Sequence, residues 1–72
     1  MTIQLISCDA DRPDRRKIAK AIEEHTDTDS NTAREYTDYL LEGSPVDVEI
    51  SSNESSAFRA FRKLDIEYEI LE

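Results

Sequence analysis

The sequence predicts an α+β fold in which strands and helices follow the order β-α-α-β-α-β. Apolar and polar residues alternate over 46–50 and 66–70, the period of a strand with one buried face. Three other segments repeat apolar residues at intervals of three and four, as a helix with one buried face does. With 72 residues the chain forms a single domain, 1–72, whose core lies between one helical layer and one sheet.

The N-terminal part of the chain predicts a strand over 2–7 and then a helix over 13–25. Asp11 is a candidate N-cap for this helix, and Pro13 suits its first turn because a proline has no N–H to leave unpaired. The apolar positions that share one face of the helix are Ile18, Ala21, Ile22 and His25.

A second helix follows after a short polar break. It can begin at Asp29, Ser30 or Thr32, since each could cap it. Gly43 is the natural residue just beyond its C-terminus, and Pro45 prevents its continuation. Its apolar face comprises Ala33, Tyr36, Thr37 and Leu40.

The C-terminal part predicts a strand over 46–50, a third helix and a last strand over 66–70. A capping box from Ser51 to Glu54 opens the helix. The two strands should run parallel, with the first strand of the chain inserted between them and antiparallel to both. All three helices then cover one face of a three-stranded sheet. The buried positions of the third helix are Ala57, Ala60, Phe61 and Leu64.

The open face of this sheet is expected to be acidic. It would carry Asp47, Glu49, Glu67 and Glu69, which alternate with the apolar residues of the two C-terminal strands. Together with a net charge of −8, these carboxylates indicate one possible function. An acidic inhibitor could mimic nucleic acid and block a protein that binds it, as small phage-encoded blockers do.

The charge also excludes classes of partner. A net charge of −8 argues against direct contact with nucleic-acid phosphates or anionic membranes, so we expect the partner to be another protein. The single cysteine cannot form an internal disulfide, and no export signal or long apolar run is present. These features predict a cytoplasmic location.

No enzyme activity, catalytic residue, cofactor or metal is predicted. His25 is expected to be partly buried or to cap its helix, since no nucleophile or carboxylate accompanies it. Cys8 is expected to be an unreactive thiol because nearby acidic residues raise a thiol pKa. Asp9, Asp11 and Asp14 lack the glycine and the terminal glutamate of a calcium loop.

Basic residues cluster on the first helix, against the sign of the whole chain. Arg15, Arg16 and Lys20 lie there, and Arg34 lies on the second helix. Two interpretations remain open. The cluster is either an ordinary solvated face or a docking surface for an acidic partner.

The order of elements and several residues resemble the C-terminal domain of the bacterial large-subunit ribosomal stalk protein, an acidic protein that recruits translational GTPases. The residues that carry the resemblance are Lys17-Ile18-Ala19-Lys20-Ala21-Ile22, Thr26, Ala33-Arg34-Glu35, Leu41-Glu42, Pro45, Ala57 and Leu64.

This resemblance implies a docking surface, because in that family a basic and apolar patch on the tandem helices contacts elongation factors. The matching positions here are Arg15, Arg16, Ala19, Lys20 and Arg34. The chain departs from the family at Asp27-Thr28-Asp29, where the family has a glycine-rich turn, and at Glu23, where a basic residue is expected. The family's dimerisation domain is also missing, so we expect a free-standing relative of the fold.

The topology is also similar to that of the adaptor of the Clp protease. Residues 9–13 resemble the acidic turn that this adaptor places before a helix-starting proline, which makes Asp9 and Asp11 residues to test. The adaptor's histidine has no counterpart at 39–41. The leading prediction is therefore a small acidic, non-enzymatic protein-interaction domain related to translation or proteolysis.

Overall fold

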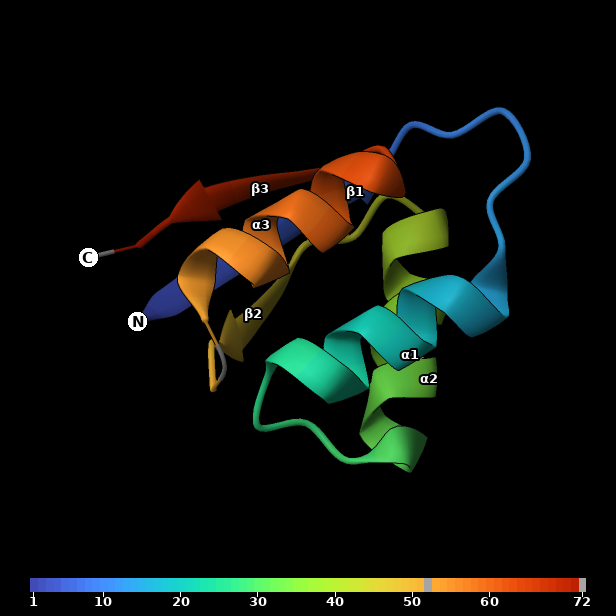
Figure 1. Cartoon of the computed structure of the whole chain (residues 1–72). Helices are drawn as coiled ribbons and strands as arrows, with labels where there is room; N and C mark the ends of the chain where they lie inside the picture. The colour runs from blue at the N-terminus through green and yellow to red at the C-terminus, as the bar shows by residue number, and fades with distance from the viewer. Residues whose placement is uncertain (52, 72) are drawn as a thin grey trace.

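The elements follow the predicted order β-α-α-β-α-β (Figure 1). The computed structural model describes residues 1–51 and 53–71, so residues 52 and 72 of the predicted domain lie outside the described part. The elements are β1 (Thr2–Cys8), α1 (Arg15–His25), α2 (Ser30–Leu41), β2 (Val46–Glu49), α3 (Glu54–Lys63) and β3 (Ile66–Ile70). Within the described residues, no helix is both long enough and apolar enough to cross a bilayer.

The strand β1 lies between β2 and β3 and runs antiparallel to both, which confirms the predicted sheet. Ile3 pairs with Val48 on one side and with Ile70 on the other. The register with β3 shifts between Leu5 and Ser7, where β1 carries a bulge. Because β1 occupies the centre, β2 and β3 are both edge strands.

The three helices cover one face of the sheet, so the domain has two layers (Figure 1). Ile3 and Leu5 of β1 are completely buried beneath them, as is Phe61 of α3. His25, Tyr36, Ala60 and Leu64, which the sequence also assigned to helix faces, are only half-buried. The buried apolar core consists of Ile3, Leu5, Ile18, Ala21, Ile22, Ala33, Leu40, Val46, Val48, Ile50, Ala57, Phe61 and Ile66.

The N-cap of α1 differs from the prediction. Asp14 caps the helix, since its carboxylate accepts a hydrogen bond from the Lys17 N–H at 3.2 Å. The expected cap, Asp11, lies in the preceding loop, because the Asp9 N–H still bonds to the Asp65 carbonyl at the end of the sheet. Pro13 therefore precedes the helix.

The N-cap of α3 was also wrongly predicted. Asn53 caps the helix by accepting the Ser56 N–H at 3.1 Å. Ser51 lies too early, because its own N–H donates to the His25 carbonyl at 3.0 Å and keeps it in the segment after β2.

Both ends of α2 match sequence candidates. Asp29, one of the three proposed starts, accepts the Thr32 N–H at 2.7 Å. At the other end the Gly43 N–H bonds to the Leu40 carbonyl and the Ser44 N–H to the Tyr39 carbonyl. This pair of bonds is a Schellman motif, and Gly43 takes the left-handed conformation that it requires, with φ +86°.

The joint between α3 and β3 places a non-glycine residue in the left-handed region. Asp65 has φ +56°, a conformation that aspartate tolerates better than most residues. Its N–H bonds to the Arg62 carbonyl at 3.0 Å, and its carbonyl accepts the Asp9 N–H at 2.9 Å. The joint therefore fixes the start of β3 against β1.

Candidate functional site

The basic cluster lies on the outer side of the helix pair α1–α2, which pack against each other (Figure 1). Burial explains this placement, because Ile18, Ala21 and Ile22 turn one face of α1 into the core. The opposite side of the helix is then left to the residues between them, so Arg15, Arg16 and Lys20 are exposed.

Two adjoining surface hollows lie along this helix pair. The larger has a volume of about 320 Å³ and the smaller about 170 Å³. Arg16, Ala19 and Arg34 line both hollows, which therefore adjoin, and the two together are here called the α1–α2 furrow. The other residues that line the furrow are Arg15, Lys20, Glu23, Ser30, Thr37 and Asp38.

The furrow contains every partner-binding residue that the sequence predicted. Arg15, Arg16, Ala19 and Lys20 come from α1, and Arg34 comes from α2. Sequence reasoning missed the contributions of Thr37 and Asp38. Thr37 was assigned only to the core, and nothing in the spacing shows that Asp38 meets α1.

Charges within the furrow are only partly neutralised. The Arg15 guanidinium lies 2.9 Å from Asp38, and the Lys20 ammonium lies 3.8 Å from Glu24. Both pairs are solvent-exposed, and such pairs contribute about 0–1 kcal/mol. Within the described residues, neither Arg16 nor Arg34 forms an ion pair. Two guanidinium groups thus remain available to an external carboxylate, which an arginine can bind through two parallel hydrogen bonds.

The N-terminus of α1 adds to the positive potential. Its first turn contains Arg15, Arg16 and Lys17 and no acidic residue. These cations lie at the positive end of the helix dipole, an unfavourable position, whereas the carboxylate of the Asp14 N-cap is favourable there. Thr37, which also lines the furrow, is uncharged, and its hydroxyl already donates a hydrogen bond to the Ala33 carbonyl at 2.8 Å.

The predicted acidic face also forms, on the side of the sheet without helices. Asp47 pairs in register with Gln4, Glu69 pairs with Gln4 from the other side, and Glu67 pairs with Ser7. The carboxylates therefore stand on both sides of an uncharged central strand. All four of the predicted residues, Asp47, Glu49, Glu67 and Glu69, are exposed.

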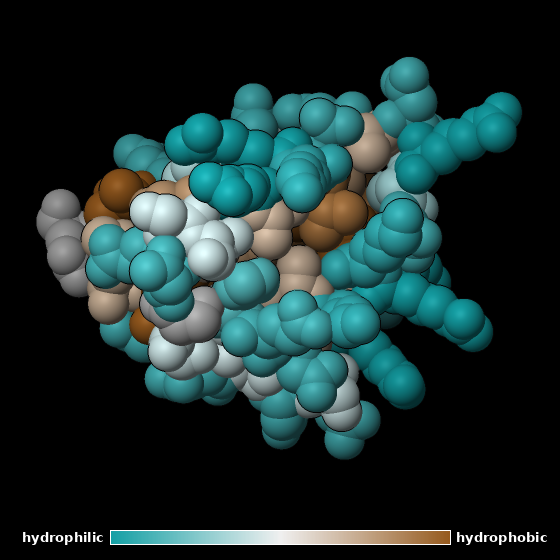
Figure 2. Space-filling model, viewed as in Figure 1, coloured by the Kyte–Doolittle hydropathy of each residue, from teal (hydrophilic) through white to brown (hydrophobic). Residues whose placement is uncertain are grey.

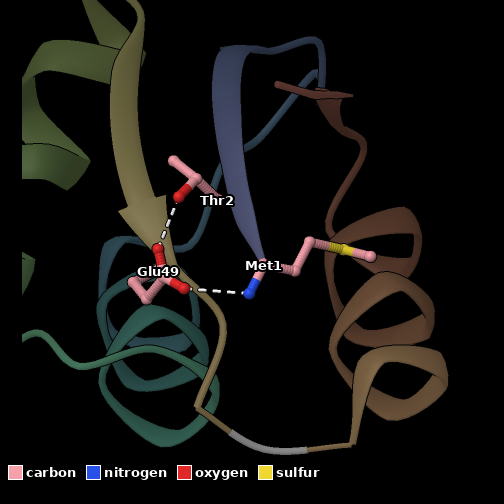
Figure 3. Close-up of polar contacts among 3 residues, drawn as sticks. All are labelled: Met1, Thr2 and Glu49. Carbon is pink, nitrogen blue, oxygen red and sulfur yellow. Dashed lines mark hydrogen bonds and ion pairs between the residues drawn. The ribbon is translucent and has the colours of Figure 1, made fainter. Parts of the chain in front are cut away.

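Glu49 differs from the other three because it is engaged within the domain (Figure 3). Its carboxylate accepts hydrogen bonds from the Met1 ammonium at 2.8 Å and from the Thr2 hydroxyl at 2.5 Å. The bond from the ammonium, followed by that from Thr2, lowers the pKa of Glu49 below its ordinary value. Asp47, Glu67 and Glu69 form no ion pair with the described residues.

The other residues that the sequence singled out as candidates for chemistry are His25, Cys8, Asp9 and Asp11. The ring of His25 is half-buried and meets Phe61 edge-on at a centroid distance of 6.3 Å. The Cys8 thiol donates to the Leu64 carbonyl at 3.4 Å. Asp9 and Asp11 are exposed in the loop after β1. Across residues 1–51 and 53–71, no three His, Cys, Asp or Glu side chains converge as metal ligands would.

Comparisons of the chain with protein-family models, with curated proteins and with solved structures find no match.

Proposed function

We propose that the protein is a non-enzymatic interaction domain that docks an acidic protein partner in the α1–α2 furrow. One observation carries the proposal. The furrow gathers the arginines of both helices on a chain of net charge −8, and Arg16 and Arg34 have no ion-pair partner among the described residues. An acidic segment could neutralise both groups and rest on the small side chain of Ala19.

The charge distribution also favours an oriented encounter. The chain as a whole carries a net charge of −8, so an acidic partner is repelled by most of the surface and attracted to the furrow, while Arg59, Arg62 and Lys63 on α3 form a second basic region that the control below tests. Such complementarity raises the association rate and fixes the bound orientation more than it raises the affinity.

The resemblance to the ribosomal stalk domain and the Clp adaptor supports a partner that takes part in translation or in proteolysis. Both are cytoplasmic machineries, and the half-buried free thiol of Cys8 suits the reducing cytoplasm in which we place the protein.

The test is the double charge reversal Arg16→Glu with Arg34→Glu. Neither side chain forms an ion pair in the described structure, so the far-ultraviolet circular dichroism and the melting temperature should stay unchanged. Proteins captured from lysate by the wild type and by the variant are compared by quantitative mass spectrometry. The proposal requires an acidic protein that the variant loses.

A matched control carries the same charge change on the third helix, Arg59→Glu with Lys63→Glu. These exposed residues lie outside the furrow, so the control should keep the captured partner. If both variants lose the partner equally, net charge and not the furrow determines binding, and the proposal fails.

The acidic sheet face supports a second candidate, an inhibitor that mimics nucleic acid. The observation that favours it is the row of carboxylates on each side of an uncharged strand, on a face without helices. Replacing Asp47, Glu49, Glu67 and Glu69 by their amides should abolish capture of a basic, nucleic-acid-binding protein. The same replacements should leave furrow binding intact, which separates the two candidates.

A further inference from the structure

The two edges of the sheet are protected to different extents. On β2, the Glu49 carbonyl accepts the Asp27 N–H at 3.1 Å, and Thr26 forms a bridge with Ile50. Pro45 immediately precedes the strand and has no N–H to offer. The segment after α1 therefore covers the end of β2, as proteins commonly do to prevent pairing with other chains.

The outer edge of β3 forms no backbone hydrogen bond with another segment among the described residues, but Ile66 is only 4% exposed, so the open part of this edge lies at Tyr68 and Ile70. The Leu71 N–H donates to the Thr2 carbonyl at 3.1 Å, so Leu71 belongs to a hydrogen-bonded pair of the β1–β3 ladder. Every second residue of β3 counted from Leu71 therefore bonds to β1. In an antiparallel ladder the residues between hydrogen-bonded pairs direct their N–H and C=O groups away from the neighbouring strand. The outward-directed residues of β3 are accordingly Ile66, Tyr68 and Ile70.

The two faces beside this edge differ in chemistry. On the open face lie Glu67 and Glu69, which form no ion pair in the described structure. On the helix face the ring of Tyr68 stacks on Phe58 at a centroid distance of 4.8 Å, and Ile70 is 47% exposed. Figure 2 shows hydrophobic surface where Figure 1 places the end of β3.

We propose that the β3 edge binds an extended segment of another protein in which lysine or arginine alternates with apolar residues. The backbone of this segment would pair with Tyr68 and Ile70 and add a fourth strand to the sheet. Its basic side chains would face Glu67 and Glu69, and its apolar side chains would pack beside Tyr68 and Ile70. This surface is separate from the α1–α2 furrow and takes a partner of opposite charge.

A second copy of the chain fits the same edge poorly. Antiparallel pairing of two β3 strands would bring Glu67 and Glu69 of each copy against those of the other, and directly opposed like charges destabilise a sheet. The net charge of −8 on each copy adds long-range repulsion.

The test uses the whole ¹⁵N-labelled chain and a synthetic peptide, acetyl-Lys-Val-Lys-Val-Lys-Val-Lys-amide. Amide signals of β3 should shift on titration, whereas those around the furrow should not. A peptide of the same composition with its lysines in one block and its valines in another should bind about tenfold more weakly, because it cannot match both faces.

Two controls test how the peptide is held. Reversing Glu67→Lys and Glu69→Lys should reduce affinity by at least about tenfold, whereas Asp47→Lys with Glu35→Lys, the same charge change away from β3, should reduce it by about twofold or less. Methylating the peptide nitrogens that face β3 should abolish binding, and methylating the alternate, solvent-facing nitrogens should not.

Three results would overturn the proposal: shifts confined to other surfaces, equal loss in both charge variants, or binding that survives methylation of the nitrogens that face β3. Shifts of β3 amides with protein concentration in the absence of peptide would also overturn it, since they would show that a second copy occupies the edge.

Discussion

Replacing Gly43 by alanine isolates the conformational requirement at the end of α2. A β-carbon built at this position has no heavy atom within 4 Å, so the substitution creates no steric clash. Its whole effect comes from the backbone, which has φ +86°. Holding a residue with a β-carbon in left-handed conformation costs about 1–2 kcal/mol. The reduced freedom of the unfolded chain returns about 0.4–1 kcal/mol.

The expected net effect of Gly43→Ala is a loss of about 1 kcal/mol in the free energy of unfolding, or about 4–8 °C in melting temperature for a domain of this size. Urea and thermal unfolding followed by circular dichroism measure it. The matched variant Gly43→Asn should lose less, because asparagine tolerates this conformation better. An alanine variant as stable as the wild type would refute the left-handed helix end.

Three further predictions concern stability. Phe61→Ala should lower the free energy of unfolding by about 3–5 kcal/mol, because the ring is completely buried; a melting temperature within a few degrees of the wild type would contradict its central place in the core. Asn53→Ala should cost about 1 kcal/mol and Ser51→Ala almost nothing in the same urea assay, since Asn53 caps α3; the reverse order would restore the sequence-predicted capping box. The pKa values of Asp29 and Glu49 are lowered, chiefly by the Thr32 N–H and by the terminal ammonium respectively, so both carboxylates stabilise the fold when ionised. Their contribution is complete above roughly pH 5 and is lost as the pH falls through the lowered folded-state pKa values. The urea midpoint of Glu49→Gln should therefore depend less on acid pH than that of the wild type, and identical pH profiles would argue against the ammonium contact.

Periodicity predicted the order of elements and the sheet topology because burial determines both. The alternation at 46–50 and 66–70 reflects strands with one face against the helices, and the same pattern placed the carboxylates on the open face. The end of α2 was also predictable, since Gly43 and Pro45 impose it through backbone conformation.

The helix starts were less predictable because several polar residues compete for each cap. Asp11 and Asp14 both precede the first helix, and Ser51 and Asn53 both precede the third. Tertiary contacts decide between them. The Asp9 N–H bond to Asp65 ties the chain to the sheet two residues before Asp11, and the Ser51 N–H bond to His25 holds Ser51 outside α3.

The candidate site was predicted by residue but not by shape. The resemblance supplied Arg15, Arg16, Ala19, Lys20 and Arg34, and the structure brings them together in one furrow. The pairing of Arg15 with Asp38 depends on how two helices pack, which single-helix periodicity does not encode. The difference between the two sheet edges was also not predictable. The cover over β2 comes from a tertiary contact between Thr26 and Ile50, and periodicity does not reveal that β3 lacks such a contact.

Site-specific photocrosslinking in cells is the most direct test of whether an acidic partner docks in the α1–α2 furrow. A photoreactive amino acid replaces Lys20 in the furrow, Asp47 on the sheet face or Ser55 on α3, one position at a time. The furrow position should capture an acidic protein that Arg16→Glu with Arg34→Glu abolishes, while the other two positions do not capture it. Capture of the partner from Asp47 alone would contradict docking in the furrow.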